Sequence, residues 1–269
     1  MASLESYRKE GEKLFNRLNL SSYPVAITYI ESPDQITNGA LQPSVYGKKM
    51  SLCQAFTMAR QHGTTVAMTY KDNFCTPATA IHRWCDVPLE DLIESQVLQG
   101  WHKNRDAEKA RFDSITRILG DEHFSAPVKY IGFLCAPISK ASFIPDSILV
   151  YCDGLQLTHI VQALSYEHQF MPTSSFEGFE ESCVKGGLIP FLTHKPQVVI
   201  PGAGDRSFAG ISAHELGIGF PGDLLFYIME NLFKTGGSMN IGFPQKTLMP
   251  MDLNEDLTPG FKYLWDKIT

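Results

Sequence analysis

Two cysteines at predicted helix starts are the residues of this sequence best suited to chemistry. Cys53 follows Ser51, and Gln54 lies three residues after that serine, a pair typical of the capping box at the first turn of a helix. Cys75 comes directly before a Thr-Pro pair, which is a second helix-start signal. A thiol at a helix start lies near unpaired N–H groups and the positive end of the helix dipole. The sequence therefore predicts lowered thiol pKa values, and the thiolate is the form that binds metals.

A weak internal repeat adds a third cysteine, Cys183. A strand, a cysteine-led segment, a second strand and a turn occur twice, first at 25–30, 53, 65–70 and 72–75, and again at 148–152, 183, 198–201 and 202–206. The spacing from Cys53 to Cys75 is 22 residues, and that from Cys183 to Gly202 is 19. A duplicated unit with a pseudo-twofold axis would bring the cysteine-led starts and the two turns together.

The hydrophobic pattern predicts an α/β or α+β fold in which helices flank a mixed sheet. The predicted strands are 24–30, 64–70, 127–137, 147–152 and 197–201. The predicted helices are 1–19, 52–61, 88–98, 106–119, 155–168 and 222–234, and an aromatic cluster in the tail after 250 is expected to pack on the body. We expect one domain over 1–269, with pseudo-symmetric halves at about 20–125 and 126–240.

The composition excludes several classes of function. The 269 residues carry a net charge of −6 and no run of lysine or arginine, so nucleic acid and anionic membranes are not expected partners. The N-terminus has no continuous apolar core, and no apolar run reaches the roughly 18 residues that a membrane span needs. We expect a cytoplasmic protein in a reducing compartment, where its six cysteines serve more often as buried residues or ligands than as disulfides.

A glycine-bearing turn after the last predicted strand is a candidate ligand site. It reads Gly202-Ala-Gly204-Asp205-Arg206, and open α/β sheets bind ligands at such turns. The turn lacks the full dinucleotide or P-loop pattern. The planar fork of Arg206 is suited to a carboxylate or phosphate, or to the neutralisation of an anionic cluster. The alternative is that Asp205 and Arg206 pair with each other or cap a neighbouring backbone.

The segments around Cys53, Cys75, Cys183 and Asp205 also carry a family resemblance. From Leu14 to Gly236 the sequence resembles the domain-of-unknown-function 169 family, also called the archaeal conserved region family, whose members come mostly from anaerobic bacteria and archaea and have no settled activity. The motifs that match are Cys53-Gln-Ala, Asn73-Phe-Cys75-Thr-Pro-Ala, Gln162-Ala-Leu-Ser-Tyr-Glu167, Cys183 and Pro201-Gly-Ala-Gly-Asp205-Arg206.

This resemblance implies a cysteine site that lacks one member. The family pattern has cysteines at the positions of Cys53, Cys75 and Cys183, and many members have a further cysteine at the position of Gly202. Here the resemblance implies three cysteine ligands with an open fourth position, which suits a [4Fe–4S] cluster or a catalytic metal. It is equally compatible with the loss of the metal, so zinc or no metal remain alternatives.

The leading interpretation is a metal-binding or iron–sulfur protein in which Asp205 and Arg206 orient a small anionic ligand. One alternative is a metal-free protein that binds a small molecule at the Asp205-Arg206 turn. Another is a thiol enzyme with Cys53 as its nucleophile. A small-molecule ligand or a redox partner is expected, and a homo-oligomer is compatible with the sequence. The spacing alone favours buried, inert thiols, and Cys85, Cys135, Cys152 and His82 are weaker candidates.

Overall fold

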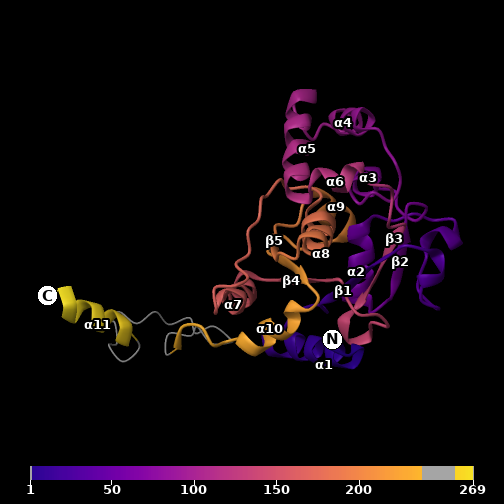
Figure 1. Ribbon diagram of the computed structural model, residues 1–269. Helices are drawn as coiled ribbons and strands as arrows, with labels where there is room; N and C mark the ends of the chain where they lie inside the picture. Colours follow the sequence, from indigo (N-terminus) through magenta and orange to yellow (C-terminus); the bar gives the residue numbers. More distant parts are fainter. Residues whose placement is uncertain (1, 238–257, 269) are drawn as a thin grey trace.

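One six-stranded sheet forms the centre of the protein, for which a computed structural model describes residues 2–237 and 258–268 (Figure 1). The strand order is β2-β3-β1-β4-β6-β5, and all neighbouring strands are antiparallel. The strands are β1 (Val25–Ile30), β2 (Val66–Thr69), β3 (Gly132–Pro137), β4 (Ser147–Cys152), β5 (Gln197–Val199) and β6 (Leu216–Pro221). The α/β class is confirmed. The predicted mixed sheet is corrected, because parallel pairing in the described residues is confined to the isolated bridges Leu41–Val66 and Met50–Asn73.

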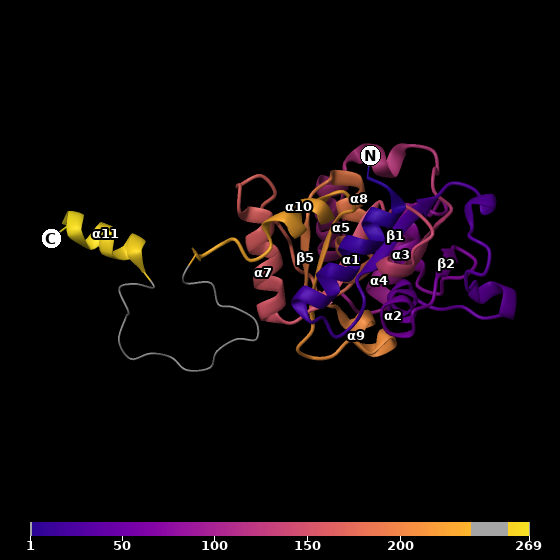
Figure 2. The ribbon, with the colours of Figure 1, turned by 90° about the horizontal axis from the view of Figure 1, so that it is seen from below.

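Helices cover both faces of this sheet (Figures 1 and 2). The helices are α1 (Leu4–Leu18), α2 (Leu52–His62), α3 (Thr76–Ile81), α4 (Leu89–Leu98), α5 (Arg105–Leu119), α6 (Asp121–Ser125), α7 (Gly154–Ser165), α8 (Ile189–Thr193), α9 (Ala203–Ala209), α10 (Leu224–Asn231), α11 (Pro259–Ile268) and a π-helix, η4 (Glu181–Leu188). One hydrophobic core lies between the sheet and α2, α3, η4 and α8, and the other lies between the sheet and α1, α7 and α10. None of the helices in 2–237 and 258–268 is long and apolar enough to cross a membrane.

The central strand β1 shows why its residues form a continuous apolar run. Val25, Ile27 and Tyr29 pack into the first core, while Ala26 packs into the second. A strand with helices on both faces buries every side chain, so it lacks the polar alternation of a half-exposed strand. The apolar run therefore predicted both the strand and its central place.

The strand order has the same pattern from both edges. The first strand of each set, β1 or β4, lies at the centre, the third strand, β3 or β6, lies next to it, and the second strand, β2 or β5, lies at the edge. This order is compatible with the predicted repeat, which does not specify it. The repeat itself stays a prediction.

Strand β6 was not predicted, because its sequence contains two glycines and ends in a proline. The predicted helix over 222–234 has no strand before it, whereas residues Leu216–Pro221 are strand and α10 begins at Leu224. A Cβ on Gly219 would lie 2.0 Å from the carbonyl oxygen of Gly186 in η4. Glycine in a strand often marks such a close backbone approach. The glycine that weakens the strand pattern therefore allows η4 to lie directly on the sheet.

The C-terminal aromatic residues differ from the prediction. Phe261, Tyr263 and Trp265 belong to α11, and each side chain is more than half exposed. Figure 2 shows α11 beyond the body of the protein. The prediction that this cluster packs on the body is therefore wrong, and the part of the predicted tail in 250–257 lies outside the described residues.

Candidate thiol and metal centre

The capping box positions Cys53 as predicted. The side chain of Ser51 accepts a hydrogen bond from the backbone N–H of Gln54, at 3.2 Å, and the Gln54 side chain accepts one from the backbone N–H of Ser51, at 2.8 Å. Such a cap stabilises a helix by about 1 kcal/mol. The Ser51 hydroxyl also lies 2.9 Å from the Cys53 sulfur. The residue that starts α2 thus also contacts the thiol in its first turn.

Cys75 is held by the loop before α3. It is the N-cap of that helix and is half-buried. The buried side chain of Asn73 accepts a hydrogen bond from the backbone N–H of Cys75, at 3.0 Å, and donates one to its carbonyl oxygen, at 2.8 Å. Because both backbone groups of Cys75 are bound by one side chain, the position of this cysteine is fixed before the helix begins.

Cys183 lies in the π-helix η4, which the sequence analysis did not predict. Eight residues form this element, a rare type of helix that occurs frequently at functional sites. The residue before it, Glu180, has a left-handed backbone with φ of 52°. Such a conformation costs a non-glycine residue about 1–3 kcal/mol and persists only where the surrounding structure holds it. Cys183 is therefore presented by a locally strained segment.

The three thiols belong to one core region and interact electrostatically. Cys53 and Cys183 are each 8% exposed and line the same hydrophobic core, against which Cys75 packs. Burial raises the pKa of Cys53 to about 12, with a further contribution from Cys75. Burial also raises the pKa of Cys75 to about 11. The pKa of Cys183 is raised well above its ordinary value by burial and then by Cys75, Asp205 and Cys53.

The raised pKa values correct the prediction that the helix starts lower the pKa of these thiols. Desolvation disfavours the charged thiolate, and here it outweighs the local N–H groups, although hydrogen bonding from Ser51 and Gln54 does lower the pKa of Cys53. The metal-free protein therefore holds its buried thiols in the protonated form at neutral pH.

Asp205 is the acidic neighbour that the three thiols share. It is buried, and its negative charge raises the pKa of Cys53, Cys75 and Cys183. Burial raises the pKa of Asp205 itself, opposed by hydrogen bonds from Gly202 and Ser182. The Gly202 N–H donates to the carboxylate at 2.9 Å, which caps α9. Asp205 therefore belongs to the thiol region.

Arg206 does not share that environment. Its guanidinium donates a hydrogen bond to the carbonyl oxygen of Ser212 at 2.6 Å, and the side chain is half-buried. Gly204, which precedes Asp205 on α9, is half-buried. The structure does not bring Asp205 and Arg206 to one ligand, because consecutive residues of a helix point in different directions.

The position of Gly202 is closed by neighbouring backbone. A Cβ added there would lie 2.5 Å from the carbonyl oxygen of Gly178 and 2.7 Å from the Cα of Phe179. The Ala203 N–H donates to the same Gly178 oxygen at 2.7 Å. The loop at 178–179 therefore occupies the space that a side chain at position 202 would need.

The remaining candidates have structural surroundings. Cys135 and Cys152 are buried in β3 and β4, as predicted, and burial raises the pKa of both thiols. Cys85 is half-buried, and its pKa is raised by burial and by Asp86. His82 lies in the core at the end of α3, where burial lowers its pKa to about 4, so it is neutral. All six cysteines are free thiols.

A buried ion network supports η4, and the sequence analysis missed it. Lys185 is 1% exposed, and its ammonium group donates to Glu181, which is fully buried, at 3.1 Å. The same Glu181 oxygen accepts the backbone N–H groups of Glu177 and Gly178, at 2.8 and 3.0 Å. The spacing of Glu181 and Lys185, one helical turn apart, is the signal that could have revealed the pair. This pair fixes the loop that closes the Gly202 position.

Arg111 extends the network from α5. It forms ion pairs with Glu180, with Glu177 at 3.2 Å and with Glu108 at 3.4 Å. These carboxylates raise the pKa of Arg111, while burial opposes them. The guanidinium also lies 4.6 Å from the centre of the Phe179 ring. The ion network, defined here as Arg111 and Lys185 with Glu108, Glu177, Glu180 and Glu181, thus contains its own cations.

The thiol centre is defined as Cys53, Cys75, Cys183 and Asp205. Within the described residues, Asp205 forms no ion pair with a lysine or arginine, and its carboxylate accepts the N–H of Gly202 instead. As the side chains of residues 2–237 and 258–268 stand, no three His, Cys, Asp or Glu residues form a group that could hold a metal ion. The centre is therefore a buried acidic cluster whose donors do not meet at one point.

Sequence comparison shows the family of this chain. Residues 13–231 match the profile of domain-of-unknown-function 169, described as uncharacterised ArCR, and the chain belongs to this family. A relative is the uncharacterized protein MJ0308 of Methanocaldococcus jannaschii, which is 25% identical over 225 residues, covering 83% of this chain and 92% of the relative. No solved structure matches the chain.

Proposed function

We propose that the protein binds an iron–sulfur cluster of the [4Fe–4S] type through Cys53, Cys75 and Cys183. The observation that carries this proposal is a group of three thiols, two buried and one half-buried, which lies with the buried carboxyl of Asp205 and is drawn from four separate segments. A buried acid without a cation must stay protonated or receive positive charge from outside. Metal binding supplies that charge and releases the thiol protons.

The spread of the donors favours a cluster over a single ion. A zinc site needs four donors at about 2.0–2.3 Å from one point, and no group of that kind occurs in the described residues. The cysteine ligands of a [4Fe–4S] cluster bind different irons, so they surround a volume and need not converge. Three thiols that influence one another without meeting agree with the second case.

The surrounding residues fit such a group. Asp205, which acts on all three thiols, would take the iron that no cysteine binds. The hydroxyl of Tyr29 is buried without a hydrogen-bond partner in the described part of the chain, and Tyr29 lies close enough to Cys183 for the thiolate charge to raise its pKa. That hydroxyl and the Ser51 hydroxyl beside Cys53 are donors for sulfur acceptors. Such hydrogen bonds tune the potential of a cluster. The cluster would supply electron transfer or activation of a substrate at the carboxylate-bound iron.

The two alternative functions have less support. A nucleophilic cysteine needs a lowered pKa and access to its substrate, whereas Cys53 is buried and its pKa is raised to about 12. Binding of a small molecule by the Asp205-Arg206 turn needs both side chains at one place, but Asp205 turns toward the thiols and Arg206 binds Ser212.

The experiment is anaerobic reconstitution of the full chain with ferrous iron and sulfide. We expect a brown protein with iron and sulfide in equal amounts, and C53S, C75S and C183S should each lose most of both. C85S is the matched control, because Cys85 lies outside the centre. Far-UV circular dichroism of the metal-free variants checks that they fold. A colourless wild-type protein without iron, or an equal loss in C85S, contradicts the proposal.

A further inference from the structure

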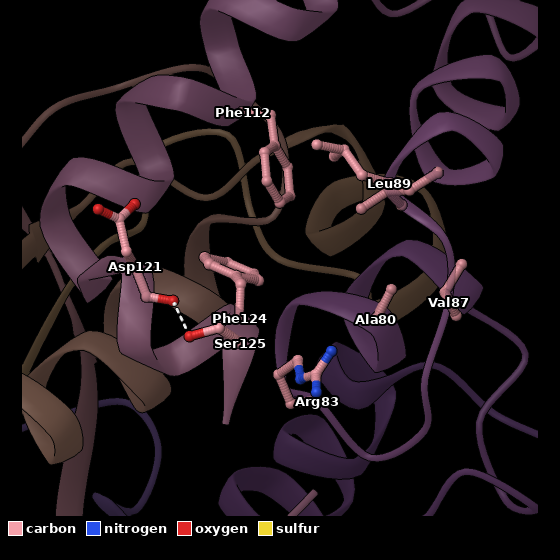
Figure 3. A pocket seen from close by; sticks show the side chains of 9 residues that line it. Ala80, Arg83, Val87, Leu89, Phe112, Asp121, Phe124 and Ser125 are labelled. Atoms are coloured by element: carbon pink, nitrogen blue, oxygen red, sulfur yellow. Dashed lines mark hydrogen bonds between the residues drawn. The ribbon is translucent and has the colours of Figure 1, made fainter. Parts of the chain in front are cut away.

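A cavity of about 300 Å³ lies between helices α3, α4, α5 and α6 (Figure 3). Its lining is mostly apolar and consists of Ala80, Arg83, Val87, Leu89, Leu92, Phe112, Asp121, Phe124 and Ser125. Concave, mainly apolar sites of this volume with a few placed polar groups are typical of small-ligand pockets. The cavity is at the C-terminal end of α3, whereas Cys75 caps the N-terminal end, so this is a second site on the molecule.

Arg83 is the cationic group of this cavity. Its backbone has φ of 56°, the left-handed conformation that commonly ends a helix, here α3. One terminal nitrogen donates to the carbonyl oxygen of Ala126 at 2.8 Å and lies 2.9 Å from the exposed carboxylate of Asp86. Arg83 lines the cavity, whereas Asp86 lies outside the lining, so the guanidinium supplies positive charge to the cavity wall.

The other polar groups of the lining do not compete for the guanidinium. Figure 3 shows Arg83 at one end of the cavity, with Leu89 and the rings of Phe112 and Phe124 across from it. The Asp121 carboxylate points away from Arg83 in the same view, and its backbone oxygen accepts the Ser125 hydroxyl at 3.0 Å. The cavity is thus divided into a cationic end and an apolar end.

We propose that this cavity binds a small monocarboxylic acid with a branched or aromatic apolar tail. The carboxylate pairs with the guanidinium of Arg83, and the tail fills the space against Phe112 and Phe124. Since one water molecule takes about 30 Å³ of liquid, the cavity holds about ten non-hydrogen atoms. A phosphate ester fits less well, because the lining offers one arginine and few other donors.

Isothermal titration calorimetry of the full chain tests the site with phenylacetate and isovalerate as probes. Their neutral amides, phenylacetamide and isovaleramide, have the same shape without the charge. We expect both acids to bind and the amides to bind at least about tenfold more weakly, because a hydrogen bond to a charged group is worth about 1.5–3 kcal/mol. The R83M variant should weaken the acids by the same factor. R117M is the matched control, since Arg117 is an exposed arginine of α5 outside the lining.

A second variant, A80L, tests whether the acids bind in this cavity without changing Arg83. A80L places a larger side chain in the lining, and we expect it to exclude phenylacetate while thermal unfolding shows an intact fold. The proposal is overturned if neither acid binds, if acids and amides bind equally, or if A80L and R83M both bind phenylacetate as the wild type does. C53S, C75S and C183S should bind the acids normally, so failure of the cluster proposal would leave this result unchanged.

Discussion

The thiol centre and the ion network are two buried acidic clusters on adjoining segments of one chain. The network holds four glutamates together with Arg111 and Lys185, and its carboxylates are paired or hydrogen-bonded. The thiol centre holds four acidic groups, and among the residues that the structure describes no ion pair joins them to a lysine or arginine. Both exclude water, so the difference lies in the source of positive charge. A cluster that supplies its own cations stabilises the fold, whereas one that lacks them is suited to a cation from outside.

The two clusters also meet physically. Glu181 binds the backbone of residues 177 and 178, and the Gly178 carbonyl closes the space beside Gly202. The network therefore shapes one wall of the thiol centre. Changes in the network should alter stability in the metal-free protein, and changes in the centre should act mainly through metal and pH.

The largest effect is expected for Lys185→Met in the network. The substitution leaves Glu181 buried without its cation, which should lower the free energy of unfolding by about 3–5 kcal/mol. Urea unfolding of the metal-free protein at pH 7 measures it. Lys13→Met, which breaks an exposed pair with Glu10, is the control and should cost less than about 1 kcal/mol. Equal stability of both variants would show that the buried pair does not support the fold.

A smaller effect is expected for Gly202→Ala at the border of the two clusters. The new Cβ would press on the Gly178 oxygen, and such overpacking costs about 1–3 kcal/mol. Gly154→Ala is the control, because a Cβ at Gly154 meets open space and the change should be within about 0.5 kcal/mol. Thermal unfolding compares the two.

The same clash predicts the behaviour of Gly202→Cys. This variant restores the family cysteine, yet its side chain has no room in the present backbone. Its iron content after reconstitution should not exceed that of the wild type. A stable variant with more iron would mean that the loop at 178–179 moves aside easily.

The smallest effect for each single residue is expected in the pH dependence of the stability of the metal-free protein. The pKa values of Cys53, Cys75 and Cys183 are raised on folding, so the folded chain binds more protons than the unfolded chain above about pH 8.5. Stability from these groups is complete below that pH and is lost as pH rises toward their folded pKa values. We expect about 1 kcal/mol lost for each thiol between pH 7.5 and about 9.5.

The triple serine variant isolates the contribution of the centre. Replacing the three cysteines removes their titration while Cys135 and Cys152 still titrate, so the variant should lose less stability over the same range. Urea unfolding at several pH values gives both slopes. Identical slopes would mean that the three thiols have ordinary pKa values in the folded chain.

The sequence predicted the features that depend on local signals. Ser51 and Gln54 predicted the start of α2, and the apolar run 24–30 predicted the central strand, because capping and burial on both faces leave patterns within a few residues. The same reasoning missed β6 and η4. Gly219 weakens the strand pattern of β6. The residue is glycine because the backbone of Gly186, far away in the sequence, lies directly against it.

The chemistry of the centre divides in the same way. The sequence by itself singled out Cys53, Cys75 and Cys183 as candidate ligands and Asp205 as part of a ligand-binding turn, because residue type and spacing are local properties. Only the tertiary structure decided that the thiols are protonated, that Asp205 rather than Arg206 acts on their pKa values, and that backbone fills the Gly202 position. Burial and charge depend on what packs around a residue, and the packing partners come from distant parts of the chain.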